Sequence, residues 1–233
     1  MPDAAAAPAP SALFGRRKGK KLRSFQAGLI EDQLPRLAVD MSRPLGDPRA
    51  LFGPAVAEVW LEIGFGGGEH LAAQAERHPR VGFIGCEPFV NGVAKLLAEM
   101  QARQLANIRL HMDDAGLLID ALPDASIACV YLLYPDPWPK RRQRKRRFVS
   151  HALLARLARV MQPGAELRFA TDIDDYCGWV LARVLRSRDF EWRAQEGGDW
   201  TRPWVGWPGT RYEAKAFAEG RAPAYLTFAR RSN

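Results

Sequence analysis

The segment Tyr134–Phe148, YPDPWPKRRQRKRRF, places one acid and one indole directly before a dense run of positive charge. Its three prolines remove backbone donors and push the residues before them toward extended conformations, so we expect a stiff loop. In such a loop Asp136 can accept hydrogen bonds from the edge of a nucleobase, and Trp138 can offer the base a flat face. The segment is therefore predicted to bind a nucleotide.

The basic run after this loop can hold the phosphates of a nucleic acid. Its members are Arg141, Arg142, Arg144, Lys145, Arg146 and Arg147. Two alternatives stay open: a basic run is also typical of a solvated face or a targeting signal, and Trp138 could pack in the core. Attachment of the run to a rigid loop favours the nucleic-acid interpretation.

A second segment, Leu61–Leu71 (LEIGFGGGEHL), has the pattern of a strand that ends in a glycine-rich turn and opens a helix. Gly64 and Gly66 would let the backbone approach a ligand closely. The dinucleotide spacing G-x-G-x-x-G is broken, because its last position falls on Glu69. Glu62 would repel a pyrophosphate but could accept from a cationic ligand. S-adenosylmethionine, whose sulfonium and amino group are positive, fits this pattern better than a dinucleotide.

Acids also end the next two expected strands. Glu87 follows FIGC, about one βα unit downstream, and is placed to hold ribose hydroxyls. Asp113 and Asp114 follow the third strand, near the place expected for an adenine, and either could serve. An acid at each of the first three strands makes a nucleoside site a far more specific prediction than the glycines alone would.

The elements that must position these residues follow a βαβ pattern, because short apolar runs alternate with helix-period segments from about residue 56 onward. Parallel strands are expected at 57–64, 81–87, 107–112, 126–134 and 165–171, a further strand at 224–230, and helices over 90–105 and 149–161. Past Asp189 we expect an irregular insertion. Its Trp200, Trp204 and Trp207 could be stacking platforms, but packing of the insertion is the favoured interpretation. The predicted fold is a doubly wound α/β sheet.

The chain has 233 residues and a formal net charge of +8, which favours a polyanionic partner without excluding an anionic membrane. Residues 1–23 are expected to be a disordered basic arm, and residues 24–233 a single domain. No apolar run is long enough to span a bilayer, and no signal peptide begins the chain, so a cytoplasmic protein is expected. Three scattered cysteines predict neither a metal site nor disulfides.

Six motifs, in this order between Leu61 and Phe228, resemble those of the bacterial tRNA (guanine-N7)-methyltransferases, the TrmB family: LEIGFGGG, GCEPF, MDDA, YPDPWPKRRQRKRR, FATD and GTRYE. The resemblance implies a Rossmann-like class I methyltransferase fold, with a seven-stranded, mostly parallel sheet, helices on both faces and an antiparallel last strand. It also implies S-adenosylmethionine as methyl donor and a guanine in the tRNA variable loop as acceptor, the m7G46 modification. The implied partner is tRNA. Neither a metal nor a membrane partner is expected from the composition, and the sequence leaves both a monomer and a homodimer open.

The resemblance also assigns roles to single residues. Its cofactor contacts fall on Glu62, Glu87, Asp114 and Asp136, with Asp136 also catalytic. Its substrate contacts fall on Lys140, Asp172, Thr210, Arg211, Tyr212 and Glu213. Gln143 stands where the family commonly has His, and T-R-Y-E replaces T-K-F-E; both changes keep hydrogen-bonding or charge character. Asp172 or Asp174 could alternatively cap the helix that follows.

Two other functions compete with this prediction. One is an exocyclic-amine nucleobase methyltransferase, whose N/D-P-P-Y/W loop PDPW resembles, although the second proline here comes one place late. The other is a non-catalytic RNA-binding protein that uses the basic run at 141–147 and the basic part of the N-terminal arm, RRKGKKLR at 16–23. For such a protein, the acids at Glu62, Glu87 and Asp114 would have no purpose.

Overall fold

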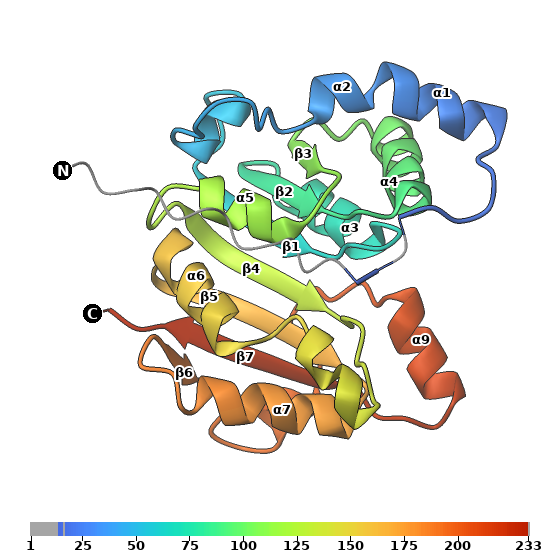
Figure 1. The fold of residues 1–233 in the computed structure, drawn as a ribbon. Coiled ribbons are helices and arrows are strands. Elements are labelled where there is room, and N and C mark those ends of the chain that lie inside the picture. Colours follow the sequence, from blue (N-terminus) through green and yellow to red (C-terminus); the bar gives the residue numbers. More distant parts are fainter. Residues whose placement is uncertain (1–13, 16, 233) are drawn as a thin grey trace.

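The computed structural model describes residues 14, 15 and 17–232, and Figure 1 shows their arrangement. Within these residues the chain forms, in order, α1 (Ser24–Asp32), α2 (Leu34–Leu37), the 3-10 helix η1 (Pro48–Leu51), β1 (Glu58–Ile63), α3 (Glu69–Arg77), β2 (Val81–Cys86), α4 (Val90–Arg103), β3 (Ile108–His111), α5 (Ala115–Ala121), β4 (Ile127–Leu133), the 3-10 helix η2 (Arg141–Arg146), α6 (His151–Val160), β5 (Met161–Thr171), α7 (Asp174–Val184), β6 (Phe190–Trp192), α8 (Gly198–Thr201), α9 (Arg211–Ala218) and β7 (Ala224–Arg230). Strands and helices alternate through most of the chain, as the βαβ pattern predicts.

The strands of the described chain form one seven-stranded sheet of order β3-β2-β1-β4-β5-β7-β6. Strands β1 to β5 pair in parallel, and β7 lies antiparallel between β5 and β6. The strand order reverses between β1 and β4, which leaves a crevice at the carboxyl ends of these two strands. The predicted doubly wound α/β fold with an antiparallel last strand is confirmed.

For most strands, the bounds expected from local sequence patterns agree with the observed bounds to within one or two residues. Strand β2 is buried along its whole length, as its continuous apolar run indicates. Strand β5 begins at Met161, before the expected residue 165, because Met161 pairs with Ile127 ahead of an irregularity in the β4–β5 register. Strand β6 was not predicted, since it has only three residues within the region expected to be irregular.

Helices cover both faces of the sheet (Figure 1). On one face α5, α6 and α7 enclose the largest apolar cluster, in which Leu153 and Leu157 are buried. On the other face α3 and α4 form a second cluster, to which α4 contributes Val93, Leu96, Leu97 and Met100 from one side of the helix. No helix within residues 17–232 has the length and apolarity that a bilayer crossing requires.

Part of the segment expected to be a disordered arm lies against the domain; residues 1–13 and 16 lie outside the described residues. The Asn91 side chain accepts from the Gly19 amide at 2.8 Å and donates to the Lys20 carbonyl at 2.7 Å. The Arg17 carbonyl accepts from the Val90 amide at 3.1 Å. These bonds join residues 17–20 to the beginning of α4.

The Trp-rich segment packs against the sheet, as predicted. The Trp204 indole donates to the Thr227 hydroxyl at 2.8 Å, and its ring lies edge-on to Tyr225. The Trp207 indole donates to the Glu213 carboxylate at 2.8 Å, and the Tyr225 hydroxyl donates to the same carboxylate. Glu213 is only 7% exposed, so this buried acid joins the insertion, α9 and β7.

We predict that Glu213→Ala lowers the free energy of unfolding more than Glu213→Gln does. The alanine leaves the Trp207 N–H and the Tyr225 O–H buried without an acceptor, at a cost of about 1–3 kcal/mol for each group. The glutamine keeps one amide oxygen in place. Urea denaturation followed by tryptophan fluorescence measures both changes. Glu219→Ala, an exposed acid at the end of the same helix, is the control and should keep the wild-type midpoint; equal stability of all variants would contradict the prediction.

Candidate active site

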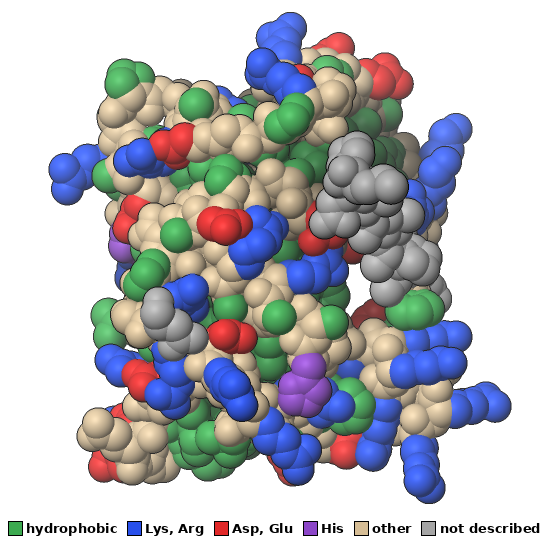
Figure 2. Space-filling view, turned by 60° about the vertical axis from the view of Figure 1, so that its left-hand side comes forward, with side chains coloured by type: hydrophobic (Ala, Val, Ile, Leu, Met, Phe, Trp, Pro, Cys, Tyr) green, Lys and Arg blue, Asp and Glu red, His purple; other side chains and the backbone are tan. Residues whose placement is uncertain are grey.

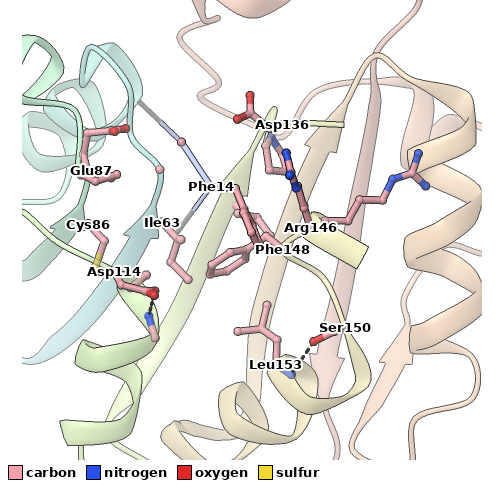
Figure 3. Close-up of a pocket in the computed structure, with 18 of the residues that line it drawn as sticks. Phe14, Ile63, Cys86, Glu87, Asp114, Asp136, Arg146, Phe148, Ser150 and Leu153 are labelled. Carbon is pink, nitrogen blue, oxygen red and sulfur yellow. Dashed lines mark hydrogen bonds between the residues drawn. The ribbon is translucent and has the colours of Figure 1, made fainter. Parts of the chain in front are cut away.

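A pocket of about 670 Å³ opens at the carboxyl ends of the central strands. It is lined from β1 by Ile63, from β2 by Cys86 and from β4 by Leu132 and Leu133, with the loops that follow these strands completing the wall. Figure 3 shows Cys86, Glu87 and Asp114 on one side, Asp136, Arg146 and Phe148 on the other, and Phe14 between them. The pocket thus lies at the reversal of strand order, where α/β sheets bind ligands.

Glu87 holds the glycine turn that follows β1. Its carboxylate accepts from the Gly66 amide at 2.7 Å and from the Phe89 amide at 3.0 Å. Gly66 has a φ of +59°, and a Cβ on Gly92 would lie 2.0 Å from the Gly66 carbonyl oxygen, so both positions require glycine. Burial raises the pKa of Glu87, and the charge of Asp136 adds to the rise, while the two amides oppose it.

The third strand brings both candidate aspartates to the pocket wall. Asp114 caps α5 by accepting from the Gly116 amide at 2.8 Å. Asp113 accepts from the Asp114 amide at 2.9 Å and from the Arg17 guanidinium at 2.8 Å. The N-terminal segment is therefore tied to the same edge of the pocket, and Asp114 stays the predicted cofactor contact.

Glu62 is not among the described residues that line the pocket. Side chains alternate along a strand, so its neighbour Ile63 faces the pocket while Glu62 faces the opposite side of the sheet. There its carboxylate lies 2.6 Å from Nδ1 of His70, whose ring contacts Tyr131 and Trp207. Direct cofactor contact by Glu62 stays a prediction to which this geometry lends no support.

The proline-rich loop leaves β4 at Tyr134, whose amide still bonds the Ala170 carbonyl at 2.8 Å. The expectation of extended backbone is wrong at two positions: φ is +48° at Tyr134 and +40° at Trp138. Such conformations cost about 1–3 kcal/mol each and persist only where surrounding contacts impose them. The turns they create leave Asp136 exposed at the pocket wall.

Trp138 lies at the pocket wall and is half-buried, so the alternative of a core tryptophan is wrong. The Arg146 guanidinium lies 5.0 Å from the centroid of the Trp138 ring and 5.0 Å from that of Phe14. The Phe14 and Trp138 rings meet edge-on, with centroids 6.3 Å apart. These three side chains form a cation–π cluster beside Asp136.

Most of the basic run projects from η2 and its flanks. Arg141, Arg142 and Lys145 are exposed, as is Lys140 before them, and Arg144 pairs with Asp175 at 2.9 Å. Figure 2 shows Lys and Arg side chains projecting along the right-hand edge of that view. A flank of this kind can follow an RNA backbone.

The prediction that every member of the basic run can hold a phosphate is wrong for Arg147. It is only 3% exposed, its Nε donates to the Pro137 carbonyl at 2.7 Å, and its guanidinium also binds Asp175. A side chain enclosed in this way cannot reach a phosphate, so Arg147 is not part of the exposed basic surface.

Of the GTRYE motif, Tyr212 lines the pocket, and its ring lies 6.3 Å from that of Tyr134 at an interplanar angle of 22°. Thr210 caps α9 by accepting from the Glu213 amide at 3.1 Å. Arg211 pairs with Glu69 at the beginning of α3.

The alternative that an aspartate after β5 caps the next helix, α7, is wrong. Asp172 accepts from the Arg221 Nε at 2.7 Å. Neither Asp172 nor Asp174 caps α7, because Ile173 occupies the N-cap position. The substrate contacts expected for Asp172, Lys140, Thr210, Arg211 and Glu213 stay predictions.

Sequence reasoning missed several pocket residues. Phe14 lies in a segment whose composition indicated only a flexible arm, so no local signal marked it. Tyr134 could have been found, since it ends a strand directly before the proline-rich loop. Phe148 comes just before α6, and Leu153 and Arg156 lie on that helix, so their approach to the pocket depends on how α6 packs.

Solved structures share this architecture at low sequence identity. The 16S rRNA methyltransferase KamB aligns with a TM-score of 0.54 and 16% identity, over 84% of this chain and 99% of its own. An rRNA methylase from Streptococcus thermophilus aligns with a TM-score of 0.51 and 13% identity, over 75% of this chain and 87% of its own. At these identities the likeness shows a shared methyltransferase fold.

Relatives of much higher identity extend along nearly the whole chain. The tRNA (guanine-N(7)-)-methyltransferase of Rhodopseudomonas palustris (strain BisB18) is 55% identical over 229 residues, which are 98% of this chain and 91% of the relative. The protein of the same name from Brucella anthropi is 55% identical over 94% of each chain. A family model described as "Putative methyltransferase" matches residues 56–225. The chain is therefore an enzyme of the bacterial tRNA (guanine-N7)-methyltransferase family.

Proposed function

We propose that this enzyme transfers a methyl group from S-adenosylmethionine to N7 of a guanine in the variable loop of tRNA, forming m7G46. The observation that carries the proposal is a single pocket that combines Glu87 and Asp114 with Asp136, beside an exposed basic flank. The names of the relatives described above support the base, the atom and the class of RNA. A tRNA substrate is consistent with action in the cytoplasm.

The residues of the pocket fit the proposed cofactor. A volume of about 670 Å³ lies within the range of small-molecule sites. Gly66 lets the backbone form part of the wall, and the Glu87 carboxylate offers oxygen acceptors that suit ribose hydroxyls. Asp114 adds an acceptor near the place proposed for the adenine. S-adenosylmethionine supplies, when bound, a methyl group activated by a positively charged sulfur.

Asp136 would receive the guanine in the other half of the pocket. Its carboxylate can accept from N1 and N2 on the Watson–Crick edge and leave N7 free. Because N7 carries a lone pair and no proton at neutral pH, the reaction needs no base to generate the nucleophile. Asp136 would instead orient the base and compensate the positive charge that develops on it.

Two sets of residues would support this base. Trp138 and Tyr212 supply aromatic surface at the pocket wall, while Thr210 and Glu213 hold the helix that carries Tyr212. Lys140, Arg211 and Asp172 are further candidate contacts. The exposed members of the basic run would hold the RNA backbone that delivers the guanine.

Incubation with unmodified tRNA and labelled S-adenosylmethionine, followed by N7-specific chain scission, tests the substrate and the atom together. Scission at one variable-loop guanine is the expected result. A methyl group on an exocyclic amine would give no scission and would establish the competing methyltransferase activity instead.

Glu87 makes the affinity for S-adenosylmethionine depend on pH. The ionised carboxylate accepts from the ribose more strongly than the protonated acid does, and burial raises the pKa of Glu87, so affinity should fall as pH decreases through a range above that of an ordinary glutamate. Glu87→Gln should bind at least about 10-fold more weakly at neutral pH, because it lacks charge-assisted bonds worth about 1.5–3 kcal/mol, and its affinity should no longer depend on pH. Calorimetry between pH 5 and about 7.5 measures both effects. The same pH dependence in the variant would show that another group causes it.

Asp136→Asn should lower the single-turnover methyl-transfer rate by at least about 100-fold with cofactor bound, because the amide lacks the charge and the paired acceptors. The wild-type rate should show no limb of a catalytic base between about pH 6 and 8. Asp32→Asn, an exposed acid at the end of α1, is the control. A limb that disappears in Asp136→Asn would make Asp136 a base and overturn this mechanism.

The basic flank should determine how tRNA affinity responds to salt. Replacing Arg141 and Arg142 by Gln should flatten the plot of log affinity against log salt by about 0.7–0.9 for each phosphate that no longer has an arginine beside it, without changing cofactor affinity. The charge-matched control replaces Arg186 and Arg188, which are exposed beyond the far end of α7. Equal slopes for the two double variants would place η2 on an ordinary solvated face.

A further inference from the structure

Arg147 lies inside the protein between the proline-rich loop and α7. Its Nε donates to the Pro137 carbonyl at 2.7 Å, and its terminal nitrogens bind the carboxylate of Asp175 and, at 3.3 Å, its carbonyl. The guanidinium also lies 4.9 Å from the ring centroids of both Tyr176 and Trp179. One side chain thus contacts two segments that are far apart in the sequence.

The bond to Pro137 acts on the part of the loop that carries the chemistry. Pro137 directly follows Asp136, and its carbonyl belongs to the peptide that leads to Trp138. The prolines at 135, 137 and 139 have no N–H with which the loop could bind itself. A donor from outside the loop is therefore well placed to hold Asp136 and Trp138 in position.

Helix α7 provides the fixed surface for this contact. The Trp179 indole donates to the Val149 carbonyl at 2.9 Å, and Tyr176 is fully buried. Asp175 also pairs with Arg144 at 2.9 Å, and its hydrogen bond with Arg147 lowers the pKa of the Asp175 carboxyl. The carboxylate therefore stays ionised and keeps both arginines in place.

We propose that Arg147 is a positioning residue for methyl transfer, which fixes Asp136 against the guanine through the Pro137 carbonyl without touching RNA. The role rests on the proposed function, in which Asp136 orients the base. Because a displacement of about 1 Å in a reacting group can cost on the order of 100-fold in rate, loosening this loop should affect the chemical step more than binding.

Arg147→Lys separates this role from a phosphate contact. Lysine keeps the positive charge, but its single ammonium lacks the planar fork that reaches Pro137 and Asp175 together. The matched control is Arg183→Lys, because Arg183 stacks on the same Trp179 ring but, among the described residues, hydrogen-bonds only the Trp179 carbonyl, at 3.0 Å. The measurements are single-turnover rate, tRNA affinity against salt, and hydrogen exchange of the amides of Tyr134, Asp136, Trp138 and Lys140.

We expect Arg147→Lys to lower the single-turnover rate by about 10- to 100-fold. The salt dependence of its tRNA affinity should not change, and hydrogen exchange of the loop amides should be faster. Arg183→Lys should stay close to wild type in all three measurements. A wild-type rate in Arg147→Lys together with a flattened salt slope in Arg147→Gln would make Arg147 a phosphate contact and overturn the proposal. Equally lowered rates in both lysine variants would show general destabilisation and would also overturn it.

Failure of the proposed function would be visible separately, as absence of N7 methylation by the wild-type enzyme. Hydrogen exchange would still test whether Arg147 holds the proline-rich loop in that case, because the measurement needs no substrate. Unchanged exchange of the loop amides in Arg147→Lys would show that Arg147 does not hold the loop.

Discussion

The site depends on how β4 ends. Its ladder with β5 continues through the Tyr134 amide, and then alternating prolines prevent the chain from forming a further strand or helix. A loop with so few donors of its own takes its shape from side chains around it. Arg147 binds its Pro137 carbonyl, and Arg146 packs over the Trp138 ring. The conformation of the loop is therefore a tertiary property, determined by residues that follow it in the chain.

The two halves of the pocket are built in different ways. On the side of β1 to β3, backbone turns and the acids at the strand ends form the wall, and the buried Glu87 binds the turn at Gly66 directly. On the side of β4, aromatic rings and guanidinium groups predominate, with Asp136 exposed among them. The first half suits a small ligand with hydroxyls and positive charge, and the second suits a base attached to a polyanion.

The sequence predicted best what depends on local pattern. Apolar runs located the strands, and acids at strand ends marked the carboxyl edge, where Glu87 and Asp114 do line one pocket. Glu62 shows a limit, since its residue type predicts an acid near the cofactor, which stays a prediction, but gives no sign of its pairing with the buried His70. The run from Arg141 to Arg147 shows another: uniform charge conceals that the last arginine is buried, because α7, which encloses it, begins 27 residues later.

Asp175 accepts from two neighbouring arginines, Arg144 and Arg147, and this sharing makes their energetic contributions interdependent. Removing one arginine leaves the carboxylate with the other, whereas removing both leaves it without either partner. The effects of single substitutions at these two positions should consequently not add, as is usual for groups that share a partner. Sequence change at any one of the three positions therefore alters which residues the other two can tolerate.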